Sequence, residues 1–313
     1  MRFSRSWRTW RRCGNANLAV PQYGLGFQTN CRRIGQSYNG VVGETAVFWL
    51  RVTLGLYSLG LGHALLTVIR RRQRLFGVAL AAFSIAAVFH LVSIVEEGLA
   101  AGRIPVGNLY QSASLIGFLI TGLFLLVYWK YKYESLAVFI FPIVFLFTLV
   151  ASFGHPVESW TNPALRSSWL AVHVVLALLG YAALFLTCVA AVMYLIQERE
   201  VKSKKPRAFY YRLPPLGALD DLAYKTMAVG FVLVTLALVA GSFWAFVEWG
   251  TRWAVDRKII LAFVTWGVYL AMIFTRWTIG WRGRKAAYFA IVGFCCAALS
   301  WVVEGGVHSF VKP

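Results

Sequence analysis

Histidine is the strongest candidate metal ligand in this chain, and two of its five histidines occupy similar settings. His173 lies near the start of one long apolar run, His308 follows another, and a tryptophan-rich segment, residues 241–258, lies between them in the sequence. Two imidazoles at one depth in a membrane can ligate a haem iron from opposite sides, and flat aromatic rings can support the porphyrin. The pattern predicts His173 and His308 as axial ligands, although each histidine taken alone is typical of a hydrogen-bonded interface residue.

The tryptophan-rich segment offers the aromatic surface for such a site. Trp249 and Trp253 are four residues apart, so that on a short interfacial helix both indoles would share one face. Asp256, together with Arg257 or Lys258, could close that helix or meet a haem propionate. A competing interpretation is that these tryptophans only form an interfacial belt, as aromatic residues do in many membrane proteins. The candidate cofactor-binding residues are Trp244, Trp249, Gly250, Trp253 and Asp256.

The other histidines are secondary candidates. His63 lies near the cytoplasmic end of the first apolar run, and His90 lies past the middle of the second. At a rise of 1.5 Å per helical residue their depths differ by roughly 12 Å, which makes them a poor axial pair. Either could still be a functional polar group, because such residues are costly to bury in a membrane and tend to line the interior of a bundle. His155 is expected in an exposed outer loop without a special role.

The elements that must position these residues are long apolar runs in a chain that is 59% hydrophobic and only 14% charged. A transmembrane helix needs roughly 20 apolar residues. Lipid leaves no partner for an open backbone, which favours helices. We therefore expect an all-α, polytopic membrane helix bundle with about eight transmembrane helices. The runs cover residues 46–69, 76–98, 109–129, 135–153, 169–196, 226–247, 259–275 and 286–303.

The distribution of lysine and arginine predicts the orientation, because these residues are enriched in cytoplasmic connections. The connections after the first, third, fifth and seventh runs hold most of these basic residues, and the alternate connections hold few. Residues 241–258 and the C-terminus are therefore expected on the outer face. The net charge of +19 is largely a consequence of this topology. No nucleic-acid-binding motif accompanies it, so no nucleic-acid partner is expected. The expected surroundings are the lipid bilayer.

The first 43 residues do not fit this scheme, because they are basic and lack the apolar core of a signal peptide. They are either a genuine extension of a membrane domain over residues 44–313 or a mis-assigned start, with the chain beginning near Val41 or Val42. The sequence contains no C-x-x-C-H motif, so covalent haem attachment to this chain is not expected.

Five segments carry a family resemblance. The stretch "WGTRWAVDRK" resembles the core of the WWD domain in haem-handling cytochrome c assembly proteins of the CcsA and CcmC type. The segments around His173 and His308 resemble those that carry the family's two outer histidines. "AGRIPVGNLYQS" and "TRWTIGWRGRKAAYFAIVGF" are similar to two further segments of the CcsA branch. The resemblance covers most of residues 100–313.

The resemblance implies a protein of the bacterial inner (cytoplasmic) membrane that binds haem b non-covalently and presents it at the outer face to apocytochrome c. By that implication His173 and His308 are the axial ligands, and Trp249, Gly250, Trp253 and Asp256 are the matching loop positions. The implied partner is a membrane subunit of the CcsB or ResB type. An active protein would be part of a cytochrome c synthetase complex, in which the chain positions haem and itself contributes no catalytic residue.

The chain departs from the family pattern at several positions. Val255 replaces the third loop tryptophan, Arg257 a proline and Ile259 a glutamate. Phe274 stands where the family has an intramembrane histidine, and phenylalanine cannot bind iron, so His63 or His90 would have to serve instead. These departures keep a second function class open, a divergent HemX-like regulatory or assembly factor without synthetase activity. A transporter, which would need broken helices and polar residues at mid-membrane, ranks last.

Overall fold

The computed structural model describes residues 25–70, 74–106, 108–154, 168–203, 212–250 and 256–302. Every regular element in these residues is an α-helix, which confirms the predicted all-α fold. The helices are α2 (Leu25–Arg70), α3 (Arg74–Ala101), α4 (Leu109–Tyr131), α5 (Leu136–Ser152), α6 (Ser168–Lys202), α7 (Leu216–Trp249), α8 (Arg257–Thr278) and α9 (Arg284–Val302).

Each of the eight predicted apolar runs coincides with one of these helices. Six helices contain a segment that is long and apolar enough to cross a membrane, and α5 is a shorter apolar helix. The protein is therefore an integral, multi-pass membrane protein. The six segments are Gly43–Thr67, Phe76–Ala101, Leu109–Tyr131, Trp169–Lys202, Leu216–Glu248 and Arg257–Thr278.

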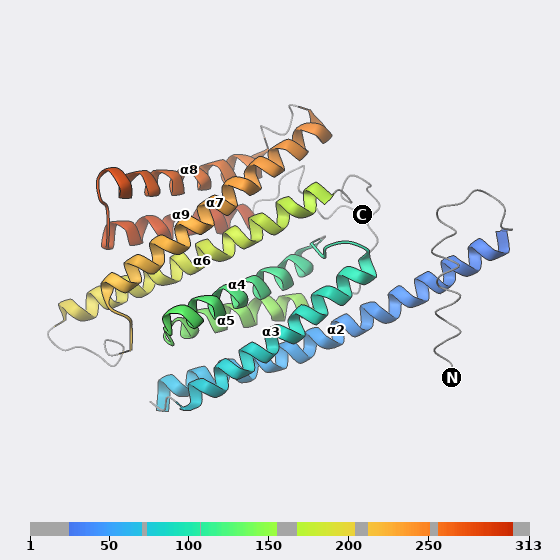
Figure 1. Ribbon diagram of the computed structural model, residues 1–313, viewed down its shortest axis with the longest axis horizontal. Helices are drawn as coiled ribbons and strands as arrows, with labels where there is room; N and C mark the ends of the chain where they lie inside the picture. Colours follow the sequence, from blue (N-terminus) through green and yellow to red (C-terminus); the bar gives the residue numbers. More distant parts are fainter. Residues whose placement is uncertain are drawn as a thin grey trace.

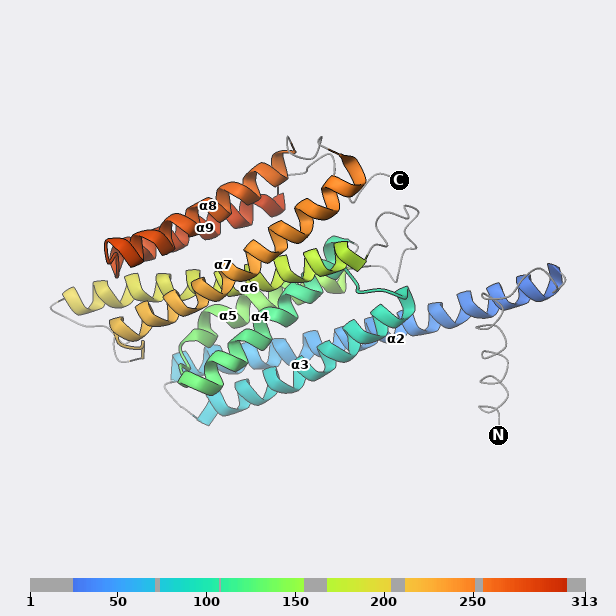
Figure 2. The same cartoon turned by 45° about the horizontal axis from the view of Figure 1, so that its top comes forward.

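The bundle has two halves that share one long direction (Figure 1). In the first half α2 packs along α3 and α5, and α4 packs along α5; in the second half α6 packs along α7 and α9, and α8 along α9. The halves meet where α4 contacts α6. The view in Figure 2 places α8 and α9 on the flank of α6 and α7 that faces away from the first half. Helix α6 therefore lies at the centre of the fold.

The two ends of the bundle differ in composition. One end, which we call the tryptophan end, holds the start of α6, the end of α7 and the start of α8 (Figure 1). The opposite basic end holds the ends of α4, α6 and α8 and the starts of α7 and α9. The separation of charge matches the pattern from which the orientation was predicted. The described cations on the elements of the basic end are Lys130, Lys132, Arg199, Lys202, Lys225, Arg276, Arg282, Arg284 and Lys285.

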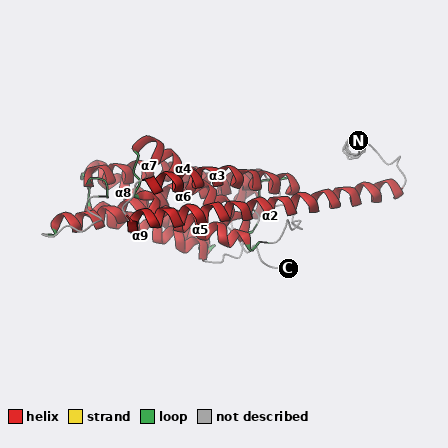
Figure 3. Ribbon diagram, turned by 90° about the horizontal axis from the view of Figure 1, so that it is seen from below, coloured by secondary structure: helices red, strands yellow, loops and turns green. Residues whose placement is uncertain are grey.

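Helix α2 is longer than the sequence analysis anticipated. It begins at Leu25 and has 46 residues, which corresponds to a length of about 69 Å at 1.5 Å per residue. Its first part projects beyond the other helices (Figure 3). The boundary predicted after residue 43 falls inside this helix, because adding one residue to an existing helix is far easier than starting a new one. The two interpretations of the chain start stay open.

Candidate functional site

His173 lies close to the start of α6, and its imidazole contacts the backbone of α7. The ring atom Nδ1 is 2.7 Å from the carbonyl oxygen of Ala237. Because a carbonyl oxygen can only accept a hydrogen bond, Nδ1 must carry the hydrogen, and in the neutral ring Nε2 then holds a free lone pair. No described residue makes a hydrogen bond to Nε2. The arrangement is the one that metal-binding histidines commonly adopt, with one nitrogen anchored and the other available.

Gly241, one helical turn beyond Ala237 on α7, provides the room for this ring. A Cβ atom built on Gly241 would lie 2.5 Å from both Nδ1 and Cε1 of His173. No side chain larger than hydrogen therefore fits at position 241 with the imidazole in this place. The close approach of α6 and α7 depends on glycine here.

Trp244 lies on α7, within the predicted apolar run 226–247, and is a buried residue. Its side chain is 7% exposed and packs in a small apolar cluster with Leu170, Val174 and Ala245. Helix α7 extends through residues 241–249, the first part of the tryptophan-rich segment 241–258. Trp169 lies nearby on α6, with its ring centroid 5.8 Å from that of Phe243. The aromatic surface is thus divided between a buried indole and a pair of more exposed rings.

The short helix predicted to carry Trp249 and Trp253 together is not formed as expected. Helix α7 ends at Trp249, and Gly250 follows with a φ of 65°, its N–H donating to the carbonyl of Phe246. Glycine adopts a positive φ without strain, and many helices end at a glycine. The i, i+4 argument therefore does not apply. Residues 251–255, with Trp253 among them, and the side chain of Trp249 lie outside the part of the chain that the structure describes.

Asp256 begins the next helix rather than ending the predicted one. Its carboxylate accepts a hydrogen bond of 2.9 Å from the backbone N–H of Lys258, and Asp256 is the N-cap of α8. The residue is only 9% exposed. Aspartate is favoured at this position because its oxygen satisfies an N–H that has no partner within the helix. The structure thus gives Asp256 a capping role, and a contact with a propionate stays a prediction.

His308 lies outside the described residues, and so does His155. The pairing of His173 with His308 therefore remains a prediction. Helix α9 nevertheless ends on the same side as the start of α6 (Figure 1), and the hydroxyls of Tyr181 and Ser300 join the two helices at 3.1 Å.

His90 is fully buried, and both of its nitrogens have hydrogen-bond partners. Nε2 is 3.0 Å from the Ser114 hydroxyl, and Nδ1 is 3.4 Å from the Tyr57 hydroxyl. Tyr57 donates its hydrogen to Thr121 at 3.2 Å. It must therefore accept from Nδ1–H of His90, which leaves Ser114 to donate to Nε2. The network joins α2, α3 and α4, and it leaves no free lone pair for a metal.

We expect replacement of His90 by leucine to destabilise the protein. The substitution leaves the hydroxyls of Tyr57 and Ser114 short of a partner inside the bundle, at a cost of about 1–3 kcal/mol in the free energy of unfolding. Denaturant titration of the detergent-solubilised protein measures this loss. Ser84→Ala is the control on the same helix, because the Ser84 hydroxyl bonds, among the described residues, only to the carbonyl of Leu80 within its own helix. Equal effects of the two substitutions would contradict the structural role of His90.

The remaining secondary candidates are separate from this network. His63 places Nδ1 3.0 Å from the carbonyl oxygen of Leu59 in its own helix. The structure does not bring His63 and His90 into contact within the described residues. Phe274, at the position of the family's intramembrane histidine, is 62% exposed on α8. No group of three or more His, Cys, Asp and Glu side chains in the described part of the chain is arranged to hold a metal ion.

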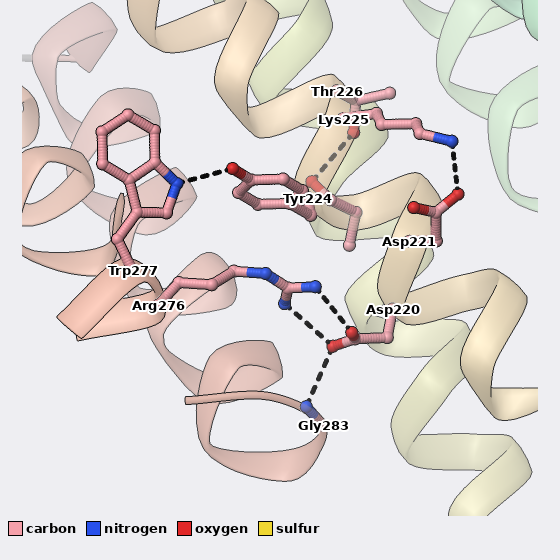
Figure 4. A network of polar contacts seen from close by, with 9 residues as sticks. Asp220, Asp221, Tyr224, Lys225, Thr226, Arg276, Trp277 and Gly283 are labelled. Carbon is pink, nitrogen blue, oxygen red and sulfur yellow. Dashed lines mark hydrogen bonds and ion pairs between the residues drawn. The ribbon is translucent and has the colours of Figure 1, made fainter. Parts of the chain in front are cut away.

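A polar cluster at the basic end was not assigned by sequence reasoning (Figure 4). Arg276 of α8 pairs with Asp220 of α7 through two hydrogen bonds of 3.2 and 2.8 Å. The backbone N–H of Gly283 donates to the same carboxylate at 2.9 Å, and the guanidinium lies 4.4 Å from the ring centroid of Tyr224. Arg276 and Gly283 belong to the segment "TRWTIGWRGRK". Its role in this structure is to fasten α8 and the following turn to α7.

The second family-like segment, "AGRIPVGNLYQS", also has a structural role. The Asn108 side chain accepts a hydrogen bond from the backbone N–H of Gln111 and caps α4. The Gln111 side chain donates to Glu97 at 2.9 Å. Together with Ser93 and Ser114 these residues line a small cavity of about 30 Å³ among α2, α3, α4 and α5. A cavity of this size holds about one water molecule.

Comparison with known proteins identifies the family. A family model described as "Cytochrome C assembly protein" matches residues 106–304. The "Cytochrome c biogenesis protein CcsA" of Microcystis aeruginosa is 30% identical over 284 residues, which cover 75% of this chain and 84% of that protein. The protein of the same name from Prochlorococcus marinus (strain MIT 9515) is 32% identical over 253 residues, covering 71% of this chain and 80% of that protein.

A solved structure has a similar fold. It is described as "Cytochrome c Heme Lyase CcmF" and superposes with a TM-score of 0.64 at 22% identity over 86% of this chain. The match covers 47% of that chain, so this protein spans about half the length of CcmF. At this level of identity the likeness concerns the fold. The family model, which matches more than half of the chain, and the CcsA relatives show that this protein belongs to the cytochrome c assembly protein family.

Proposed function

We propose that this protein binds haem b non-covalently at the tryptophan end, with His173 and His308 as axial ligands, and presents it for attachment to apocytochrome c. The observation that carries the proposal is the His173 imidazole, whose Nδ1–H is anchored on the carbonyl of Ala237 while Nε2 has no hydrogen-bond partner among the described residues. The relatives named as CcsA and the fold shared with a protein named as a haem lyase support the same assignment.

The register of α6 against α9 supports the choice of His308 as the second ligand. Tyr181 on α6 contacts Ser300 on α9, and the two helices run in opposite directions. His173 precedes Tyr181 by eight residues, and His308 follows Ser300 by eight residues. Two axial ligands of one iron must lie at the same end of the bundle, and the antiparallel packing of α6 and α9 brings the start of α6 and the end of α9 to the tryptophan end.

In this proposal the chain positions haem, and the covalent chemistry belongs to the cofactor and the substrate. Haem supplies the vinyl groups that react with the cysteine thiols of an apocytochrome C-x-x-C-H motif. His173 would hold the iron through Nε2, and the indoles near it would exclude water from the bound haem. The segregation of Lys and Arg at the basic end supports a tryptophan end on the outer face of the bacterial cytoplasmic membrane, facing apocytochrome c. A CcsB- or ResB-type subunit is the proposed membrane partner.

An absorption spectrum tests the proposal. The protein is expressed in cells supplied with the haem precursor 5-aminolaevulinate and purified in detergent. We expect a Soret band with the sharp α and β bands of a low-spin, bis-histidine haem. The pyridine assay should identify the pigment as haem b, and acid–acetone should extract it, because no covalent bond is expected. A spectrum without a Soret band would contradict the proposal and favour the HemX-like regulatory or assembly role, to which the loss of a histidine at Phe274 already points.

A further inference from the structure

We infer that Gly241 is a positioning residue for His173, and that the α7 backbone from Ala237 to Gly241 sets the orientation of the iron-binding imidazole. The inference rests on the proposed function, because it gives the structural basis on which His173 would act as an axial ligand. It adds Gly241, the first residue of the tryptophan-rich segment, which is not among the candidate cofactor-binding residues and which acts through His173.

The first observation is the close contact between the imidazole and α7. A Cβ atom at position 241 would approach Nδ1 and Cε1 of the ring to 2.5 Å. Real Cβ atoms essentially never come this close to another heavy atom, so the ring would have to move. The α7 backbone is less able to yield, because it belongs to a continuous helix that packs along α6. A methyl group at this position therefore displaces the imidazole and leaves the helix in place.

The second observation is the hydrogen bond that the displacement would break. Nδ1 of His173 donates to the Ala237 carbonyl at 2.7 Å, and Ala237 lies four residues before Gly241 on the same helix. A ring pushed away from Gly241 also moves away from this oxygen. The bond fixes the tautomer in which Nε2 can bind iron, and it raises the electron density on that nitrogen. Gly241 thus leaves room for the imidazole, and the carbonyl of Ala237 keeps the hydrogen on Nδ1.

The contact at Gly241 differs from the other close glycine contacts between these helices. Gly230, also on α7, would place a Cβ 2.8 Å from Cδ2 of Leu184 on α6. That contact is purely apolar and involves no candidate ligand. A comparison of the two glycines therefore separates a general packing effect from a specific effect on His173.

The experiment compares haem binding by the wild type, Gly241→Ala and Gly230→Ala in detergent. We expect Gly241→Ala to bind haem about 10- to 100-fold more weakly, the loss typical when a hydrogen bond that orients a metal ligand is removed. We also expect the bound fraction to show a high-spin component and a midpoint potential more positive than that of the wild type. Gly230→Ala should keep the wild-type spectrum and potential, even if its thermal stability falls. In the His173→Ala background, Gly241→Ala should have no further effect on haem affinity.

The outcomes separate the inference from the proposed function. If the wild type binds haem and Gly241→Ala retains its affinity, spin state and potential, the inference is wrong and the proposed function stands. Lack of haem binding by the wild type would remove both. Should Gly241→Ala fail to fold, ¹⁵N NMR of histidine-labelled wild-type protein without haem decides the matter. Hydrogen on Nδ1 of His173 supports the inference, and hydrogen on Nε2 overturns it.

Discussion

Replacing His173 by alanine is expected to abolish the low-spin haem spectrum of the purified protein. The substitution removes Nε2, which in the proposed site supplies one of the two iron ligands, and alanine offers no replacement. The α7 contacts of the ring, the hydrogen bond to Ala237 and the close approach to Gly241, disappear with it. We expect haem content to fall at least tenfold, as measured by the ratio of the Soret absorbance to the protein absorbance at 280 nm.

Two further variants show whether the loss is specific. His308→Ala should have the same effect, because a bis-histidine site requires both ligands. His155→Ala is the control, since His155 is expected in an exposed outer loop and is not proposed as an iron ligand. It should retain the wild-type spectrum. Addition of imidazole to His173→Ala should restore part of the low-spin signal by filling the vacated position. A full low-spin spectrum in His173→Ala without imidazole would refute the assignment.

The largest effect on stability is expected from Asp220→Ala. Asp220 and Arg276 form a two-pronged ion pair whose side chains are 15% and 11% exposed, and the carboxylate also accepts from the N–H of Gly283. Removing the carboxylate leaves a largely buried guanidinium and an N–H without that partner. Breaking such a pair from one side typically costs about 3–5 kcal/mol. Equilibrium unfolding of the solubilised protein in denaturant should show a loss of this size in the free energy of unfolding.

The neighbouring aspartate provides the control for this prediction. Asp221 pairs with Lys225 at 2.6 Å, but its side chain is 51% exposed and that of Lys225 is 53% exposed. Exposed pairs of this kind contribute less than about 1 kcal/mol. Asp221→Ala should therefore leave the unfolding transition almost unchanged. The double variant Asp220→Ala/Arg276→Ala should be less destabilised than the sum of the two single variants, because it leaves no unpaired charge. Similar losses in the free energy of unfolding for Asp220→Ala and Asp221→Ala would show that burial does not determine how much the Asp220–Arg276 pair stabilises the protein.

The sequence alone predicted the helices of the part of the chain that the structure describes. Each apolar run became a helix because the residues that cross a membrane must be apolar and must satisfy their own backbone hydrogen bonds. The concentration of Lys and Arg at one end of the bundle could be predicted for a similar reason, since charged residues stay outside the hydrocarbon core of the membrane. The sequence also drew attention to His173 and to the segments around Asn108 and Arg276. These inferences required only local composition or short motifs.

The tertiary structure decided what the individual side chains do. The buried position of Trp244, the capping role of Asp256 and the two partners of His90 all differ from, or add to, what the sequence indicated. Gly241 and Asp220 were not singled out at all. Each of these roles depends on the rotation of one helix against another and on their relative shift along the axis. Hydropathy along a single segment carries no information on either quantity, because both are fixed only when residues distant in the sequence pack together.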